Sequence, residues 1–89
     1  MTEPRHYTVT IKASAEREMA SLPKSAFRAV STKILALETT PRPHGCKKLS
    51  GRDEYRVRAG DYRILYVVDD AAAMVDVIAV GNRKDVYRR

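Results

Sequence analysis

Residues 55–66 read YRVRAGDYRILY, and this stretch has the pattern of a β-hairpin. Gly60-Asp61 is a typical two-residue turn sequence, because glycine accepts the positive φ that such a turn requires. A two-residue turn pairs Ala59 with Tyr62 and thereby fixes the register of both strands. Paired residues share a face of the hairpin, and successive residues alternate between its two faces.

With this register the two faces of the hairpin differ in chemistry. One face is apolar and is formed by Tyr55, Val57, Ile64 and Tyr66. The other face carries three arginines, Arg56, Arg58 and Arg63. Arg58 is predicted to lie directly opposite Arg63, and a like-charged pair of this kind costs a sheet roughly 0.2–1 kcal/mol. Guanidinium groups held together against such repulsion are typical of a site for an anion, and phosphate is the first candidate.

The length and charge of the chain narrow the class of protein. Its 89 residues suit one small domain, residues 1–89, and its one cysteine, Cys46, has no partner for an internal disulfide. No secretory signal and no membrane-spanning apolar run is seen, so we expect a cytoplasmic protein. The net charge of +6 favours nucleic acid, an anionic surface or an acidic protein as partner. Basic residues are densest in one segment, at Arg42, Lys47, Lys48, Arg52, Arg56, Arg58 and Arg63.

Two helices are predicted between an N-terminal strand and the hairpin. Residues 6–12 alternate between apolar and polar side chains, as a half-buried strand does. Ser14 is in position to cap the first helix, which runs to Pro23 with an apolar face at Ala15, Met19 and Leu22. The second helix is predicted over residues 24–38, with an apolar face formed by Phe27, Val30, Ile34 and Leu37.

The remaining segments complete a sheet. A short strand is expected at residues 47–49, and a turn at residues 69–72. Residues 74–80 are almost continuously apolar, which is expected of a strand covered on both faces. The order of elements predicts an α+β fold, in which the N-terminal strand and a two-helix hairpin pack on a mostly antiparallel sheet.

Familiar catalytic and cofactor motifs are missing from the sequence. His6 and His44 are far apart and fit no metal-ligand spacing, so each is interpreted as a surface histidine. No glycine-rich phosphate loop or dinucleotide fingerprint occurs, and we expect neither a metal nor a cofactor. The candidates that remain are arginine, lysine and tyrosine side chains, which suit phosphate recognition and the stabilisation of negative charge in a transition state.

The sequence resembles the RelE/ParE superfamily of toxins from type II toxin–antitoxin systems, and more closely its RelE branch. The motifs that carry the resemblance are KLSG at 48–51, YRVR at 55–58, GDYRILY at 60–66, VGNR at 80–83 and DVY at 85–87. The resemblance implies a RelE-like, microbial-ribonuclease-like fold. It also implies a ribosome-dependent endoribonuclease (mRNA interferase) that cleaves mRNA in the decoding site and so inhibits translation. Its partners are then the ribosome with its rRNA, the mRNA, and a cognate antitoxin protein.

The resemblance also implies roles for individual residues. Carried over by position, the family's catalytic residues fall on Arg58, Arg63, Arg83 and Tyr87. In such toxins the 2′-hydroxyl of the messenger attacks its own adjacent phosphate and expels the 5′-oxygen. Arg63 is expected to neutralise the phosphate, Arg83 to lie by the leaving oxygen, and Tyr87 to stack on or orient a nucleotide. The residues expected to bind RNA are Arg56 on the messenger backbone, and Lys47, Lys48 and Arg52 on rRNA.

This chain departs from the best-known RelE pattern, which has lysines at the positions of Arg56 and Arg58. The second of those lysines is the suspected general base, whereas a guanidinium with a pKa above ~12 does not readily lose its proton. Three explanations stay open: the protein works mainly by aligning the RNA and stabilising charge, Tyr87 or a ribosomal group accepts the proton, or nuclease activity is weak or lost. Two other functions also stay open: a ParE-like inhibitor of DNA gyrase and a non-catalytic ribosome- or RNA-binding module.

Overall fold

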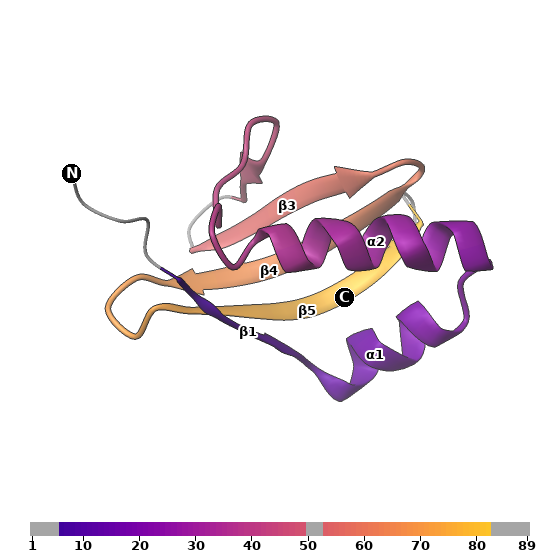
Figure 1. The fold of residues 1–89 in the computed structure, drawn as a ribbon, viewed down its shortest axis with the longest axis horizontal. Helices are drawn as coiled ribbons and strands as arrows, with labels where there is room; N and C mark the ends of the chain where they lie inside the picture. The colour runs from indigo at the N-terminus through magenta and orange to yellow at the C-terminus, as the bar shows by residue number, and fades with distance from the viewer. Residues whose placement is uncertain (1–5, 50–52, 83–89) are drawn as a thin grey trace.

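Within residues 6–49 and 53–82, which the computed structural model describes, the fold consists of two helices and a five-stranded sheet (Figure 1). The elements are β1 (Thr8–Ile11), α1 (Ala13–Ala20), α2 (Lys24–Ala36), β2 (Lys47–Lys48), β3 (Glu54–Ala59), β4 (Tyr62–Asp69) and β5 (Met74–Asn82). The strand order is β1-β5-β4-β3-β2, and only the β1–β5 pair is parallel. The predicted α+β fold with a mostly antiparallel sheet is confirmed.

The hydrophobic core lies between the two helices and one face of the sheet (Figure 1). Val30, Ile34 and Leu37 from the α2 region are buried there against Val57 and Ile64 of the hairpin. Each fully buried aliphatic side chain contributes about 1.5–3 kcal/mol. The helices therefore cover one face of the sheet and leave the opposite face, here called the outer face, available for a site.

The β3–β4 hairpin has the predicted register. Ala59 pairs with Tyr62, Arg58 with Arg63, and Tyr55 with Tyr66. Gly60 has a φ of 62°, and no positive φ occurs at Asp61, which is the pattern of a type II′ turn. The turn sequence and the strand alternation thus fix which side chains reach the outer face.

The helix boundaries differ from the predictions at both helices. Ser14 is not the N-cap of α1, because the helix begins at Ala13 and the N–H of Glu16 already bonds the carbonyl of Lys12. In α2, regular helix ends at Ala36 rather than at residue 38, because the next N–H groups bond three residues back. Phe27 is 44% exposed, so its assignment to the apolar core face was wrong; it lies in the first turn, where the described elements leave it uncovered.

Strand β5 is not covered on both faces as predicted. Val75 and Val77 are buried under the helices, but Met74 is 37% exposed and Asp76 is only half-buried. Ile78 is an extra residue at a bulge, since Leu65 pairs with Ala79 while Tyr66 pairs with Val77. On the outer face, the apolar residues of β5 belong to a small cluster formed by Leu49, Leu65, Ile78 and Ala79. No second layer of described elements covers that face. Neither described helix is long and apolar enough to span a bilayer.

Candidate RNA-binding and catalytic site

The centre of the candidate site is the cross-strand pair of Arg58 and Arg63 on the outer face. On its other side Arg63 pairs with Gly81 of β5, which has no side chain to occupy the space. A hollow of about 290 Å³ lies at this end of the hairpin, lined by Arg58, Gly60, Asp61, Arg63 and Asn82. Arginines of neighbouring strands therefore meet at one hollow, as an anion site requires.

Arg56 lies on the same face but in different surroundings. It is only 8% exposed, and its Nε has no hydrogen-bond partner among the described residues. In the sheet it lies between Lys47 of β2 and Leu65 of β4, whereas β2 begins only at Lys47 and does not extend alongside Arg58. Flanking strands on both sides bury Arg56, and the open edge leaves Arg58 exposed. The sequence predicted the shared face of these arginines, but not this difference.

The other residues predicted to bind RNA are only partly brought together. Lys47 pairs with Arg56 and so shares the outer face, while Lys48 pairs with Tyr55 and shares the opposite one. Lys48 Nζ lies 3.9 Å from Asp53 Oδ1, a long and exposed ion pair. Arg52, Arg83 and Tyr87 lie outside the described residues, so their roles stay predictions.

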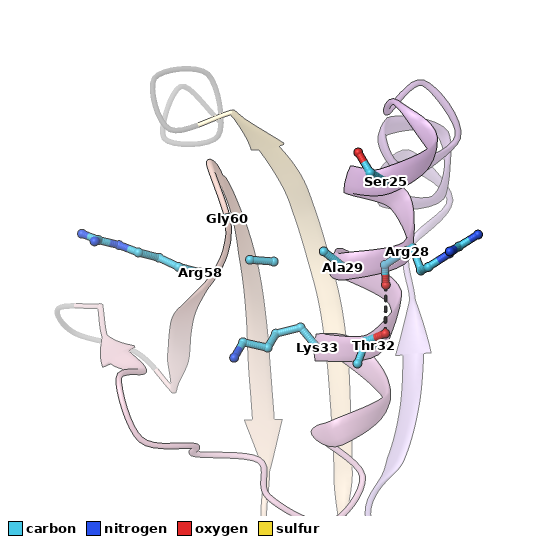
Figure 2. Close-up of a pocket in the computed structure, with 8 residues that line it drawn as sticks. Ser25, Arg28, Ala29, Thr32, Lys33, Arg58 and Gly60 are labelled. Carbon is cyan, nitrogen blue, oxygen red and sulfur yellow. Dashed lines mark hydrogen bonds between the residues drawn. The ribbon is translucent and has the colours of Figure 1, made fainter.

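A larger hollow of about 540 Å³ separates α2 from the hairpin tip (Figure 2). It is lined by small residues of both elements and by cations: Ser25, Arg28, Ala29, Thr32, Lys33, Arg58, Ala59 and Gly60. Figure 2 shows Lys33 extending from α2 toward the hairpin, while Arg58 and Arg28 extend away to opposite sides. Lys33 was not predictable from the sequence, because a lysine on a helix is ordinary until the fold brings it to a hollow that Arg58 also lines.

A third hollow, of about 400 Å³, adjoins Arg58 at the β3 edge. Its lining comes from α2, from the loop before β2 and from β3: Lys33, His44, Gly45, Arg56, Val57 and Arg58. His44 is exposed, as a surface histidine should be, but it shares this hollow with both β3 arginines. The described residues contain no group of His, Cys, Asp and Glu side chains that could hold a metal ion.

The loop that carries His44 is anchored to the far end of the sheet. Tyr66 donates a hydrogen bond of 2.7 Å from its hydroxyl to the carbonyl of Pro41. Arg42 binds both carboxylate oxygens of Asp70, at 3.1 and 2.8 Å, and its Nε donates to the Tyr55 hydroxyl at 2.8 Å. The hydrogen bond to Asp70, with that to Tyr55, raises the pKa of Arg42, and burial raises the pKa of Tyr66.

Comparison with known proteins places the chain in a family. The family model described as ParE toxin of the type II toxin–antitoxin system parDE matches residues 9–87. This chain belongs to the RelE/ParE family of toxins of type II toxin–antitoxin systems. Toxin RelG of Mycobacterium tuberculosis is 33% identical over 87 residues, covering 93% of this toxin and 98% of RelG. Toxin RelE of the same organism is 30% identical over 91 residues, covering 99% of this toxin and 93% of RelE.

Solved structures place this toxin in the RelE branch. The M. tuberculosis RelBE2 toxin–antitoxin complex matches with a TM-score of 0.77 and 30% identity, over 88% of this toxin and 99% of that chain. The intact Escherichia coli RelBE complex matches with a TM-score of 0.75 and 27% identity, over 85% and 95% of the respective chains. The RelE-like fold implied by the sequence motifs is therefore confirmed.

Proposed function

We propose that this toxin is a ribosome-dependent endoribonuclease that cleaves mRNA in the decoding site and so arrests translation in the cytoplasm. The observation that carries the proposal is the Arg58–Arg63 pair, held across the hairpin at the hollow that Asn82 also lines. Guanidinium groups concentrated in this way also suit a protein that only clamps phosphate. A nuclease needs them, because the phosphate gains charge as it is attacked.

The chemistry follows from the groups at this site. The attacking 2′-hydroxyl belongs to the messenger, so the protein must orient the RNA and stabilise the transition state. Arg63 lies between Arg58 and the side-chain-free Gly81, where it can contact the non-bridging oxygens of a bound phosphate. Arg83, which follows directly after β5 in the sequence, is assigned to the leaving 5′-oxygen. Tyr87 is assigned to the orientation of a nucleotide.

A cognate antitoxin is proposed as the protein partner. The similar chains from M. tuberculosis, Pyrococcus horikoshii and E. coli were each solved in complex with a RelB antitoxin. The net charge of +6 suits a partner with an acidic contact surface. Such a partner would keep the toxin from the ribosome by covering its basic face.

A second candidate function is inhibition of DNA gyrase. It is favoured by the match of residues 9–87 to a family model named for ParE. This candidate predicts a DNA-damage response and uncut messengers, whereas a non-catalytic ribosome-binding module predicts arrested translation with intact messengers.

The test is primer extension on messengers from cells that briefly express the toxin. Endonucleolysis predicts new 5′ ends inside translated codons, absent from the untranslated regions of the same transcripts and from cells expressing Arg63→Ala. Intact messengers during growth arrest would refute the proposal, and a simultaneous DNA-damage response would favour the gyrase alternative.

A further inference from the structure

The hollow at the open edge of β3 has a charge distribution suited to an anion. Its lining among the described residues includes Lys33, Arg56 and Arg58 and no carboxylate, and its volume of about 400 Å³ lies in the range of small-ligand sites. Arg56 is 8% exposed, and its buried Nε has no partner among the described residues. A buried N–H without an acceptor is unfavourable, and such a group beside this hollow is consistent with an acceptor that binds there.

This hollow shares a lining residue, Arg58, with the hollow at the Arg58–Arg63 pair. Arg58 lines both the hollow at Arg63 and Asn82 and the one at Lys33 and His44. Arg58 therefore connects the two hollows, and a nucleotide bound at Arg58 adjoins both of them. His44 lines the second of these hollows together with Arg58.

His44 is held in place by its own turn and by the anchored loop. The N–H of Cys46 donates to the carbonyl of Pro43 at 3.0 Å, which closes a turn with His44 and Gly45 at its centre. Gly45 has a φ of 91°, which is strained for any other residue and defines the turn. The hydrogen bond from Tyr66 to Pro41 on one side and β2 on the other fix the ends of the loop.

The imidazole supplies what the arginines lack. Cleavage by the 2′-hydroxyl requires a group that takes its proton, and a guanidinium does not readily do so. Four described residues with charged or titratable side chains line the hollow: Lys33 of α2, Arg56 and Arg58 of β3, and His44 itself. Of these side-chain types, imidazole is the one suited to exchange protons near neutral pH.

We propose that His44 is the proton acceptor of this toxin. Its neutral imidazole takes the proton of the 2′-hydroxyl while the 2′-oxygen bonds to the adjacent phosphorus. The bond from phosphorus to the 5′-oxygen breaks, and that oxygen takes a proton from water. The products are a 2′,3′-cyclic phosphate and a 5′-hydroxyl, and the hydroxide formed is neutralised by the imidazolium proton. This inference rests on the proposed nuclease function.

The test is single-turnover cleavage of a short messenger on purified ribosomes, for the wild type, His44→Ala and a His6→Ala control. His6 is exposed and precedes β1, away from the hollows that contain Arg58. We expect His44→Ala to lower the rate by about 100-fold to 10,000-fold, with unchanged ribosome binding, and His6→Ala to have no effect. The wild-type rate should fall toward acidic pH, and His44→Ala should lose that dependence.

Chemical rescue separates catalysis from a merely structural role. Free imidazole should restore part of the cleavage by His44→Ala and leave the wild type unchanged. A wild-type rate in His44→Ala would overturn the inference, as would a slower rate with the same pH profile and no rescue. Loss of the pH dependence in Lys33→Ala instead would assign the proton to Lys33. If the wild type itself leaves the messenger intact, the nuclease function fails and this inference with it.

Discussion

Arg58 and Arg63 occupy directly opposed positions on β3 and β4, so two positive side chains share one cross-strand pair. Arg58 has no ion-pair partner among the described residues, although the sequence contains 11 acidic side chains. Like charges directly opposite each other destabilise a sheet. The presence of this pair is explained if a phosphate lies between the guanidinium groups during function.

This relationship predicts opposite effects on stability and activity. Arg58→Ala should raise the free energy of unfolding by roughly 0.2–1 kcal/mol, because the like-charge pair is removed. Cleavage should fall by about 100-fold or more, because a donor to the charged phosphate is lost. Urea unfolding and single-turnover cleavage measure the two effects, and Arg17→Ala, on an exposed position of α1, is the control for activity. Lower stability together with unchanged cleavage would show that Arg58 has a structural role.

The conservative replacement Arg58→Lys should behave differently from Arg58→Ala. It keeps the positive charge and restores the titratable amine found in the best-known RelE pattern. We expect cleavage to be retained or raised in the same assay. A complete loss of cutting would show that lysine and arginine do not have related roles at this position.

Arg63→Ala should relieve toxicity without unfolding the protein. Arg63 pairs with Gly81 and with Arg58, so its truncation removes no apolar contact within these pairs. Growth of cells that express wild type and variant at equal levels measures the effect, and circular dichroism checks the fold. A folded variant that still blocks growth fully would place the active site elsewhere.

Contacts that anchor the loop carrying His44 to the far end of the sheet should affect cleavage. Arg42→Ala removes the ion pair to Asp70 at 2.8 Å and the contact of the guanidinium carbon with the Tyr55 ring, 5.1 Å from its centroid. Because this ion pair is substantially exposed, we expect a loss of only about 1 kcal/mol in the free energy of unfolding. Cleavage should fall further than this loss accounts for, because the loop that carries His44 loses one of its anchors.

The matched control for Arg42→Ala is Asp53→Asn, which breaks the longer pair to Lys48 at 3.9 Å. Thermal unfolding and ribosomal cleavage should both stay close to wild type in this variant. Equal effects of the two changes would mean that the loop anchor has no special role.

The raised pKa of Tyr66 predicts that the protein loses stability at alkaline pH. Burial raises its pKa in the folded state, while an unfolded tyrosine titrates near pH ~10. The contribution of the neutral hydroxyl is therefore complete below pH ~10 and declines as the pH rises toward the folded-state pKa. Tyr66→Phe should be less stable at neutral pH, because the bond to Pro41 is lost, but should show a shallower decline above pH ~10. Parallel decline of both proteins in urea titrations would contradict this assignment.

Local patterns were sufficient to predict the hairpin and the face that its arginines share. Gly60-Asp61 fixes the register, and strand alternation then decides the position of every side chain between Tyr55 and Tyr66. The burial of Arg56 was not predictable, because it depends on where β2 ends relative to β3. The 44% exposure of Phe27 was likewise not predictable, because its spacing is that of the apolar face of α2.

The residues around Arg58 that come from other elements were harder to predict from the sequence. His44 and Lys33 are neighbours of Arg58 only because the loop and α2 return to the same edge of β3. Isolated histidines and helical lysines are usually solvent-exposed and without function, so the sequence favoured that interpretation. The fold brings both residues to a hollow that Arg58 also lines. Arg58 is the residue that stands in place of the suspected general base of the best-known RelE pattern.

The most direct test of the account is to incubate the purified toxin with one messenger, free or bound to programmed ribosomes, and to identify the ends of any fragments. The account predicts a cut within the codon at the decoding site, only on ribosomes, leaving a 2′,3′-cyclic phosphate and a 5′-hydroxyl, and absent with Arg63→Ala. An intact messenger on ribosomes that have bound the toxin, or fragments with 3′-hydroxyl and 5′-phosphate ends, would contradict it.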